Sequence, residues 1–231
     1  MQKIVFNDRY GLTDAVIEGR KTMTRRLVSD RLWEIWTNYD DFCNSVIGGI
    51  ARDGTSVSRE YYHECDFFKD KCRHKVGEVV AVAQSYEQVY RQGNMDADDA
   101  IIRGLKYDPG MYNKMYVRAA LMPHQIRIIR IRCERLQDIS DEDCMREGVR
   151  QFTPDFPKDF PIHPTHFVVG NILKNTPRDA FAEFIDKDSG RGTWERNPWV
   201  MVYEFELLKY RDSRKIKIKC RKMRTFQYSK P

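Results

Sequence analysis

The sequence contains no long hydrophobic run, and this and other absences exclude several classes of protein. No stretch approaches the ~20 consecutive apolar residues that a membrane-spanning helix needs, so we expect no membrane partner. The N-terminal stretch MQKIVFNDRY has no apolar core of signal-peptide length, and we therefore expect a cytoplasmic protein. There is no internal repeat, and the six cysteines are scattered rather than framed for disulfide bonds, which predicts reduced thiols.

The composition is that of a globular chain with a core. Of 231 residues, 41% are hydrophobic and 32% are charged. The net charge of +6 mildly favours polyanionic partners. Nothing in the composition fixes the oligomeric state.

Residues 209–231 form a basic C-terminal tail. Ten basic residues stand against a single acid, Asp212, with Tyr210, Phe226 and Tyr228 between them. Basic residues neutralise phosphates and aromatic rings stack on bases, so the tail suits a nucleic-acid arm. The segment KIKIKC also alternates as an edge strand does, and edge lysines discourage aggregation. Both interpretations remain open.

Hydrophobic periodicity predicts a mixed α+β fold. We predict strands within 75–86, 115–121, 125–133 and 199–208, and helices at 13–19, 140–148 and 176–185. Thr13, Ser140 and Thr176 are the expected N-caps. The pattern suggests one domain over 1–208, a small barrel with short flanking helices, and loop-rich insertions at 31–72, 88–113 and 151–175.

The stretch GRKTMTRR, residues 19–26, combines four cations with two threonines. From the residues alone it is either a solvated basic turn or the lining of a pocket for an anionic or nucleotide-like ligand. Lys21 and Thr24 point to opposite faces of a straight strand and converge only if the segment turns.

Four segments in order resemble the ASCH domain family of the PUA-like superfamily, in its larger prokaryotic and phage-type members. GRKTMTRR fits the family's basic motif through Gly19, Lys21, Thr24 and Arg26. The other segments are KVGEVVAV (75–82), ERLQDISDEDCMREGV (134–149) and WERNPWVMVYEF (194–205). The resemblance implies a small PUA-like β-barrel and binding of RNA or a modified base.

Some small ASCH proteins hydrolyse the acetyl group of N(4)-acetylcytidine. Transferred by motif, the resemblance implies Lys21, Thr24 and Glu147 as the catalytic residues. Amide hydrolysis needs a nucleophile, which Thr24 supplies, and a base, which Lys21 supplies only if its pKa falls well below about 10.4. Glu147 lies at the end of a predicted helix, where the macrodipole disfavours a negative charge, so a cationic partner such as Lys21 is expected. No cofactor is expected.

Other residues are candidates for contact with a nucleic acid or nucleoside. They are Arg20, Arg25, Arg26, Gln84, Tyr86, Trp194 and Asn197. Gln84 stands in a stretch where larger family members carry an arginine–glutamate pair. Glutamine hydrogen-bonds a base edge but serves as neither acid nor base, which favours a binding protein over a hydrolase.

The stretch 63–74 holds four side chains that are able to bind zinc, namely His63, Cys65, Cys72 and His74. Their one-residue gaps differ from the spacing of about two to four residues in zinc fingers, and we predict no metal site while leaving zinc as the alternative.

Three functions are therefore considered. The first is recognition of RNA or a modified nucleoside in a basic cavity. The second is deacetylation of N(4)-acetylcytidine or a related nucleoside. The third is a non-enzymatic protein-interaction module of a nucleic-acid complex.

Overall fold

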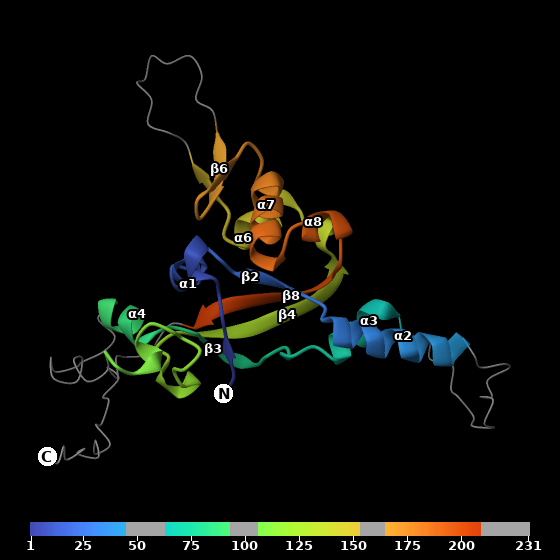
Figure 1. Ribbon diagram of the computed structural model, residues 1–231, viewed down its shortest axis with the longest axis horizontal. Coiled ribbons are helices and arrows are strands. Elements are labelled where there is room, and N and C mark those ends of the chain that lie inside the picture. The colour runs from blue at the N-terminus through green and yellow to red at the C-terminus, as the bar shows by residue number, and fades with distance from the viewer. Residues whose placement is uncertain (45–62, 93–105, 153–164, 209–231) are drawn as a thin grey trace, which may run out of the picture. The chain divides into compact units, whose positions relative to one another are not determined.

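The structure is a computed structural model that describes residues 1–44, 63–92, 106–152 and 165–208 (Figure 1). The predictions for the basic tail and for parts of the three insertions fall outside the described residues. The chain divides into two compact units. Unit 1 comprises residues 1–6, 79–126 and the chain from 208 onward, and unit 2 comprises 7–78 and 127–207.

Unit 1 contains a pair of short parallel strands. β1 (Lys3–Ile4) pairs with β3 (Val79–Val82), and Lys3 lies opposite Ala81. α4 (Tyr86–Arg91) follows β3, and the Ser85 hydroxyl caps it by accepting a hydrogen bond from the backbone of Gln88. Two single turns of 3-10 helix come next in the chain, η2 (Pro109–Met111) and η3 (Ala119–Leu121). β4 (Gln125–Arg135) begins in unit 1 and continues in unit 2.

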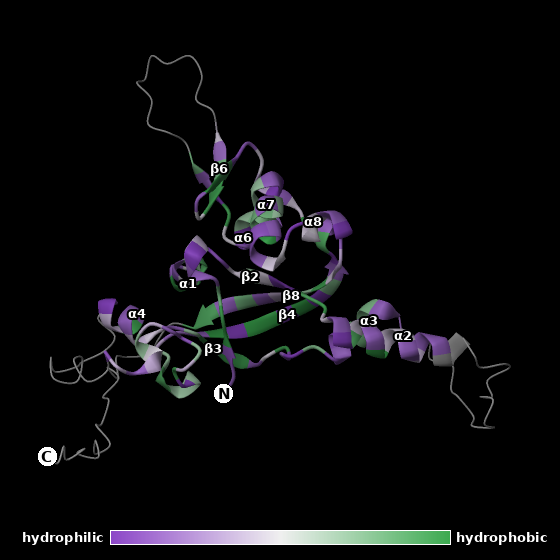
Figure 2. Cartoon of the chain, in the orientation of Figure 1, coloured by the Kyte–Doolittle hydropathy of each residue, from purple (hydrophilic) through white to green (hydrophobic). Residues whose placement is uncertain are grey.

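Unit 2 contains an antiparallel strand pair that carries much of the candidate site. β2 (Met23–Leu27) pairs with β8 (Trp199–Leu208), with Thr24 opposite Tyr203, and β4 lies on the other side of β8. Hydrophobic and hydrophilic residues alternate along the first part of β4 (Figure 2). Because strand side chains alternate between faces, this part of β4 presents two chemically different sides. β8 is instead buried at every position from 200 to 205, where it lies between β4 and β2.

A second sheet in unit 2 supports the longest well-capped helix. β5 (Arg150–Phe152), β6 (His166–Val169) and β7 (Ile172–Lys174) pair in antiparallel order, and α7 (Pro177–Ser189) packs on β6 and β7. The Thr176 hydroxyl accepts a hydrogen bond from the backbone of Asp179 and caps α7. The helix buries one face, which consists of Ala180, Phe181, Phe184 and Ile185.

The remaining elements of unit 2 are short, apart from α2. They are η1 (Asp8–Tyr10), α1 (Leu12–Ile17), α2 (Asp30–Asn44), α3 (Glu64–Asp70), η4 (Leu136–Asp138), α6 (Asp141–Arg146) and α8 (Thr193–Arg196). α2 and α3 are joined by aromatic packing, in which the ring centroids of Trp36 and Phe67 lie 5.2 Å apart.

The predicted α+β class is confirmed. The described strands form two open sheets, of order β1-β3-β4-β8-β2 and β5-β6-β7, and they do not close into a barrel. The predicted strands at 125–133 and 199–208 and the helices at 140–148 and 176–185 are present as β4, β8, α6 and α7. None of the described helices is both long enough and apolar enough to cross a bilayer.

Three local predictions were wrong. Residues 115–121 contain η3 rather than a strand. α1 begins after Gly11, which has a φ of 67°, and the Thr13 hydroxyl donates to Asp8 instead of capping the helix. The stretch 31–72, predicted to be loop-rich, contains α3 and most of α2, because their aromatic residues pack on one another.

Candidate functional site

The centre of the candidate site is a buried ion pair between Lys21 and Glu147. Lys21 is 2% exposed and Glu147 is 4% exposed. The Lys21 ammonium group donates to the Glu147 carboxylate at 2.6 Å and to the Glu147 backbone carbonyl at 2.6 Å. One side chain thus neutralises the carboxylate and also satisfies a carbonyl at the end of α6, which the helix leaves without an internal partner.

Local backbone features position both residues. The turn after α1 uses a left-handed glycine, Gly19, with a φ of 77°. The backbone N–H of Lys21 then donates to the Ala15 carbonyl at 2.9 Å, and the next N–H, of Thr22, donates to the Arg146 carbonyl at 3.0 Å. The segment before β2 is therefore attached directly to the end of α6, next to Glu147.

Burial lowers the pKa of Lys21. The adjacent Glu147 carboxylate raises the pKa of this lysine, and the cations Arg26 and Arg25 lower it further; the net pKa lies below its ordinary value of 10.5. The direction is the one that a lysine general base requires.

Arg25 extends the pair into a network of charges. Its guanidinium contacts three carboxylates, those of Glu134 at 2.6 Å, Asp143 at 2.9 Å and Glu147 at 3.2 Å. Burial opposes the charge on Arg25, yet these carboxylates raise its pKa above the ordinary value. The proposed ligand-binding residue Arg25 therefore has its donors engaged by protein groups in this structure.

The network continues along β4, α6 and β8 through Arg132, Arg146 and Glu204. Arg132 contacts Asp143 at 2.8 Å, and Arg146 contacts Glu204 at 2.9 Å. Among the described residues its members are five cations and four carboxylates: Lys21, Arg25, Arg130, Arg132 and Arg146, with Glu134, Asp143, Glu147 and Glu204. Arg130 joins at the exposed edge, 3.8 Å from Glu204. The carboxylates offset all but one of these cations, so the network mainly holds β2, β4, β8 and α6 together.

Thr24 lies on the other face of β2. The residues 23–27 are extended, so Thr24 and Arg25 point in opposite directions. Thr24 is 4% exposed and is paired across the strands with Tyr203. Arg26 alternates with Arg25 in the same way and is exposed. The structure joins Lys21 to Glu147 and places the third predicted catalytic residue on the opposite side of the strand.

A cavity of about 270 Å³ adjoins the buried pair. Its wall includes Arg20 and Gly148, the immediate chain neighbours of Lys21 and Glu147, together with Tyr10, Arg150 and Gly170. A Cβ on Gly148 would lie 3.6 Å from Cδ of Lys21 and 3.0 Å from a methyl group of Leu12. Gly148 thus lines the cavity and also lies next to the lysine stem.

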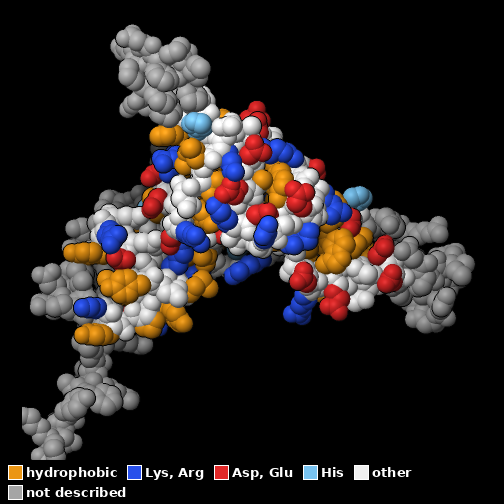
Figure 3. Space-filling model, turned by 45° about the horizontal axis from the view of Figure 1, so that its top comes forward, with side chains coloured by type: hydrophobic (Ala, Val, Ile, Leu, Met, Phe, Trp, Pro, Cys, Tyr) orange, Lys and Arg blue, Asp and Glu red, His pale blue; other side chains and the backbone are white. Residues whose placement is uncertain are grey.

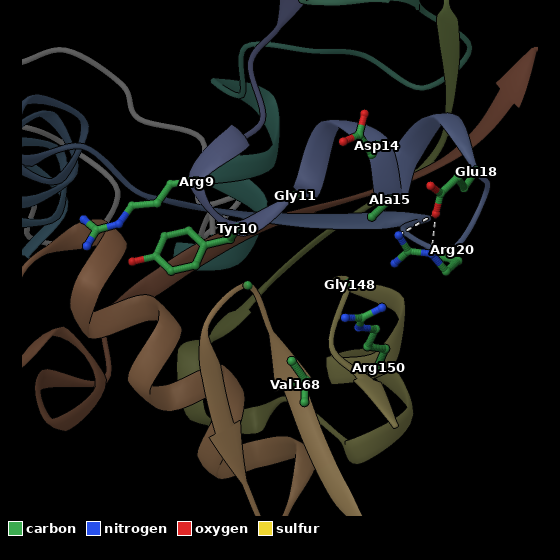
Figure 4. A pocket seen from close by; sticks show the side chains of 11 residues that line it. Arg9, Tyr10, Gly11, Asp14, Ala15, Glu18, Arg20, Gly148, Arg150 and Val168 are labelled. Atoms are coloured by element: carbon green, nitrogen blue, oxygen red, sulfur yellow. Dashed lines mark hydrogen bonds and ion pairs between the residues drawn. The ribbon is translucent and has the colours of Figure 1, made fainter. Parts of the chain in front are cut away.

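Two of the arginines that line the cavity, Arg20 and Arg150, differ in whether their guanidinium groups pair with a neighbouring carboxylate (Figure 4). The Arg20 Nε donates to Glu18 at 2.7 Å. Arg150, at the start of β5, is exposed, and its guanidinium has no hydrogen-bond or ion-pair partner among the described residues. Arg150 thus brings to the cavity wall a guanidinium that the described part of the chain leaves unengaged. The sequence signal for it was slight, since it follows the 134–149 motif by one residue.

The ring of Tyr10 forms an apolar part of the same wall. Tyr10 is 4% exposed and its ring meets Phe184 edge-on, with centroids 5.0 Å apart. Its hydroxyl is buried without a hydrogen-bond partner among the described residues. No feature of the sequence around Tyr10 distinguished it from the other tyrosines.

Gln84 and Tyr86 belong to unit 1. The Gln84 side chain is fully buried, donates to Gln92 at 2.7 Å and is hydrogen-bonded to the His124 ring at 2.8 Å. Tyr86 opens α4 and lies close to Gly110. Both side chains have structural partners within their own unit.

Trp194 and Asn197 organise the turn around α8. Trp194 packs edge-on against Phe181 with centroids 6.3 Å apart, and the Arg178 guanidinium lies 5.2 Å from its ring centroid. Asn197 adopts a left-handed φ of 46°, and its side-chain oxygen accepts a hydrogen bond from the Gln137 backbone at 2.8 Å. These contacts place both residues in the packing that leads into β8.

The four predicted alternative zinc ligands have separate partners. His63 accepts a hydrogen bond from the Cys65 backbone at the start of α3, and Cys72 donates to the His74 carbonyl at 2.8 Å. The His74 ring lies 3.3 Å from the Glu78 carboxylate. Within the described part of the chain, no three His, Cys, Asp or Glu side chains gather in a way that would hold a metal ion.

Comparison with known proteins identified no relative of this chain. A scan against protein-family models, a search of curated proteins and a search of solved structures each found no match. The class that the structure defines is a mixed α+β protein with a small open cavity beside a buried lysine–glutamate pair.

Proposed function

We propose that this chain is a PUA-like, ASCH-type protein that recognises RNA or a modified nucleoside in the cavity beside Lys21 and Glu147. The observation that carries the proposal is the guanidinium of Arg150, which no described residue engages, at a nucleoside-sized cavity. The motif resemblance and the positive net charge of +6 support it.

The size of the cavity limits the ligand. At about 270 Å³ it is close to the lower end of ligand pockets, which run from roughly 300 to 1,000 Å³. A single base or nucleoside fits this space, and a folded polynucleotide does not. An RNA ligand would therefore present one unpaired nucleotide to the cavity.

The wall holds three arginines, Arg9, Arg20 and Arg150, and two acids, Asp14 and Glu18. Glu18 pairs with Arg20, and the small surplus of positive charge favours an anionic or carbonyl-bearing ligand. A guanidinium suits phosphate and planar carbonyl groups because its donors form a rigid fork. Tyr10 contributes an aromatic wall, and aromatic walls suit bases.

Hydrolysis is the second candidate, supported by the lowered pKa of Lys21. A lysine that loses its proton more readily is closer to the state required of a base. The position of Thr24 on the other face of β2 favours recognition over hydrolysis, because a nucleophile must lie within hydrogen-bond reach of its base.

The binding test is a titration with cytidine 5′-monophosphate and with N(4)-acetylcytidine. We expect Arg150→Ala to weaken binding of the nucleotide by about tenfold, the effect of losing one charge-assisted hydrogen bond. The matched control is Arg191→Ala, which removes an exposed arginine outside the cavity and should leave the affinity unchanged. Equal affinities of wild type and Arg150→Ala would contradict the proposal.

The hydrolysis test is release of cytidine from N(4)-acetylcytidine by wild type and Lys21→Ala. The variant must first be shown to be folded, because it removes one of the two cationic partners of a buried carboxylate. Turnover by wild type that disappears in folded Lys21→Ala would move hydrolysis from second candidate to first. Binding without turnover would leave recognition as the function.

A further inference from the structure

Unit 1 carries a surface of exposed aromatic side chains that the cavity does not involve. In residues 106–121, Tyr107 is 87% exposed, Tyr112 is 65%, Met115 is 58% and Tyr116 is 67%. We call this surface the tyrosine platform. Figure 3 shows hydrophobic side chains, with lysine and arginine side chains among them, gathered at the left, where Figure 1 draws α4 and residues 106–121. Concentrations of exposed apolar groups commonly mark binding surfaces.

The backbone beneath the platform is fixed by a clamp from the N-terminal strand. The Lys3 ammonium group donates to the carbonyls of Lys114 at 3.0 Å, Met115 at 2.5 Å and Val117 at 2.8 Å. In the opposite direction, the Lys114 ammonium group donates to the Phe6 carbonyl. Lys3 thus holds three carbonyls of the loop, and the loop's own Lys114 anchors it to the backbone at Phe6. A loop fixed in this way presents its side chains in a set arrangement, which reduces the entropy lost on binding.

The inward-facing residues of the same segment complete the support. Val117 is 1% exposed and packs with Ala81 and Met122 in the core of unit 1. Gly110 is buried so tightly that a Cβ there would lie 2.8 Å from the Tyr86 ring and 2.9 Å from Val117. The Tyr86 ring therefore packs beneath the loop at Gly110. The tyrosines of the platform are exposed to solvent.

The charges around the platform are mainly positive. Lys106 and Arg118 are exposed, and the acid of the segment, Asp108, accepts a hydrogen bond from the Gly110 backbone at 2.7 Å. Tyrosine rings beside cations match a ligand with flat apolar faces and an anionic backbone. Tyrosine, methionine and arginine are also common in protein interfaces, so the experiment must distinguish a nucleic-acid strand from a protein partner.

We propose that the tyrosine platform binds single-stranded nucleic acid, with Tyr107, Tyr112 and Tyr116 stacking on unpaired bases and Lys106 and Arg118 contacting phosphates. The platform extends the proposed function by naming a polymer as the ligand. Because it shares no residue with the cavity, each site can fail without the other.

The experiment measures the affinity of the full chain for a single-stranded RNA of about ten nucleotides, within the ~4–16 nucleotides that a small domain covers. We expect each Tyr→Ala substitution to weaken binding by about tenfold, and Tyr→Phe at the same positions to retain it, since phenylalanine still stacks. All three side chains are exposed, so the fold should tolerate the changes. Leu173→Ala, at a 51% exposed residue in unit 2, is the matched control.

Further measurements identify the kind of nucleic acid that binds. Lys106→Ala should reduce the slope of log affinity against log salt by about 0.7, the value for one phosphate contact to a single strand. A duplex of the same sequence should bind more weakly, with no dependence on the tyrosines, because its bases are already stacked. A DNA strand of the same sequence shares the stacking chemistry, so its affinity relative to RNA shows which polymer is preferred.

The outcomes are distinct. Loss of RNA affinity in the Tyr→Ala variants with recovery in Tyr→Phe supports the platform. Unchanged affinity in the triple Tyr→Ala variant, an equal loss in Leu173→Ala, or no RNA binding by wild type overturns it, and a protein would then be the occupant to test. Loss of nucleoside binding in Arg150→Ala with intact RNA binding bears on the cavity alone.

Discussion

The ammonium group of Lys21 is hydrogen-bonded to both the carboxylate and the backbone carbonyl of Glu147, each at 2.6 Å, although the two residues are 126 positions apart. The contact joins the segment before β2 to the end of α6. It also fixes Gly148 and Arg20, the neighbours of these residues that line the cavity. The pair is therefore structural whatever chemistry it performs.

We expect Lys21→Met to lower the free energy of unfolding by about 3–5 kcal/mol, because the Glu147 carboxylate would stay buried with one cationic partner removed. The measurement is urea unfolding at neutral pH. The double variant Lys21→Met/Glu147→Gln should lose less than the sum of the single variants, because neither charge is then left alone. Additive losses would contradict a direct coupling between the two side chains.

Asp143 should make the protein acid-sensitive. Burial raises the pKa of this carboxyl, but hydrogen bonds from Arg132 and Arg25 outweigh burial and lower the pKa below its ordinary value of 3.8. A carboxyl whose pKa is lower in the folded state contributes stability above the unfolded-state pKa and loses it as the pH falls through the folded-state pKa. The contribution is therefore present above about pH 4 and disappears below it.

The check compares the unfolding free energy of wild type and Asp143→Asn between about pH 6 and pH 3. The variant is expected to be less stable at neutral pH and to lose less stability on acidification. Parallel curves for the two proteins would show that Asp143 does not carry this acid sensitivity.

The sequence predicted the elements whose signals are local. β4 alternates in hydrophobicity, β8 is rich in β-branched and aromatic residues, and α6 and α7 carry their own caps at Ser140 and Thr176. The strand predicted at 115–121 was wrong because its carbonyls bond to the side chain of Lys3, more than 110 residues away in the chain. No local pattern reveals such a partner.

The candidate site was predicted in part. Because the macrodipole disfavours a negative charge at the end of a helix, a cationic partner was expected for Glu147, and Lys21 is that partner. The catalytic roles of these residues stay predictions. The sequence did not indicate that Arg25 would be engaged by three carboxylates, because Glu134 and Asp143 reach it only through the pairing of β2, β4 and β8 and the packing of α6. Arg150 was missed for the same reason, since a cavity is a tertiary feature.

The thiols of Cys133 and Cys144 should resist alkylation in the folded protein. Cys144 is buried and Cys133 is half-buried. Burial raises the pKa of Cys144 to about 12, and partial burial together with the neighbouring Cys65 raises the pKa of Cys133 to about 12. Since the thiolate is the reactive form, only about one thiol in 10⁴ is ionised at a pH of about 8. Peptide mapping after iodoacetamide treatment should show slow labelling at both cysteines in native protein and fast labelling in urea. Equal rates in the two conditions would contradict the raised pKa values of these thiols.

The lack of a side chain at Gly170 allows the turn between β6 and β7 to lie close to Tyr10. Its φ is 58°, and a Cβ there would lie 2.7 Å from the Tyr10 ring and 2.9 Å from the Tyr10 Cα. The backbone of Tyr10 cannot retreat as a flexible side chain can, so Gly170→Ala combines left-handed strain of about 1–2 kcal/mol with overpacking of about 1–3 kcal/mol. Gly77→Ala is the matched control, since Gly77 has a φ of 84° and nothing within 4 Å of a Cβ.

Comparing Gly77→Ala with Gly170→Ala separates the cost of left-handed backbone strain from the cost of the contact with Tyr10. We expect Gly77→Ala to lower the free energy of unfolding by about 1–2 kcal/mol and Gly170→Ala to lower it further. Because Gly170 and Tyr10 both line the cavity, Gly170→Ala should also weaken nucleotide binding, whereas Gly77→Ala should not. Equal stability losses in urea unfolding would mean that Tyr10 does not press on Gly170. A stability difference without any change in nucleotide affinity would mean that this wall of the cavity does not contact the ligand.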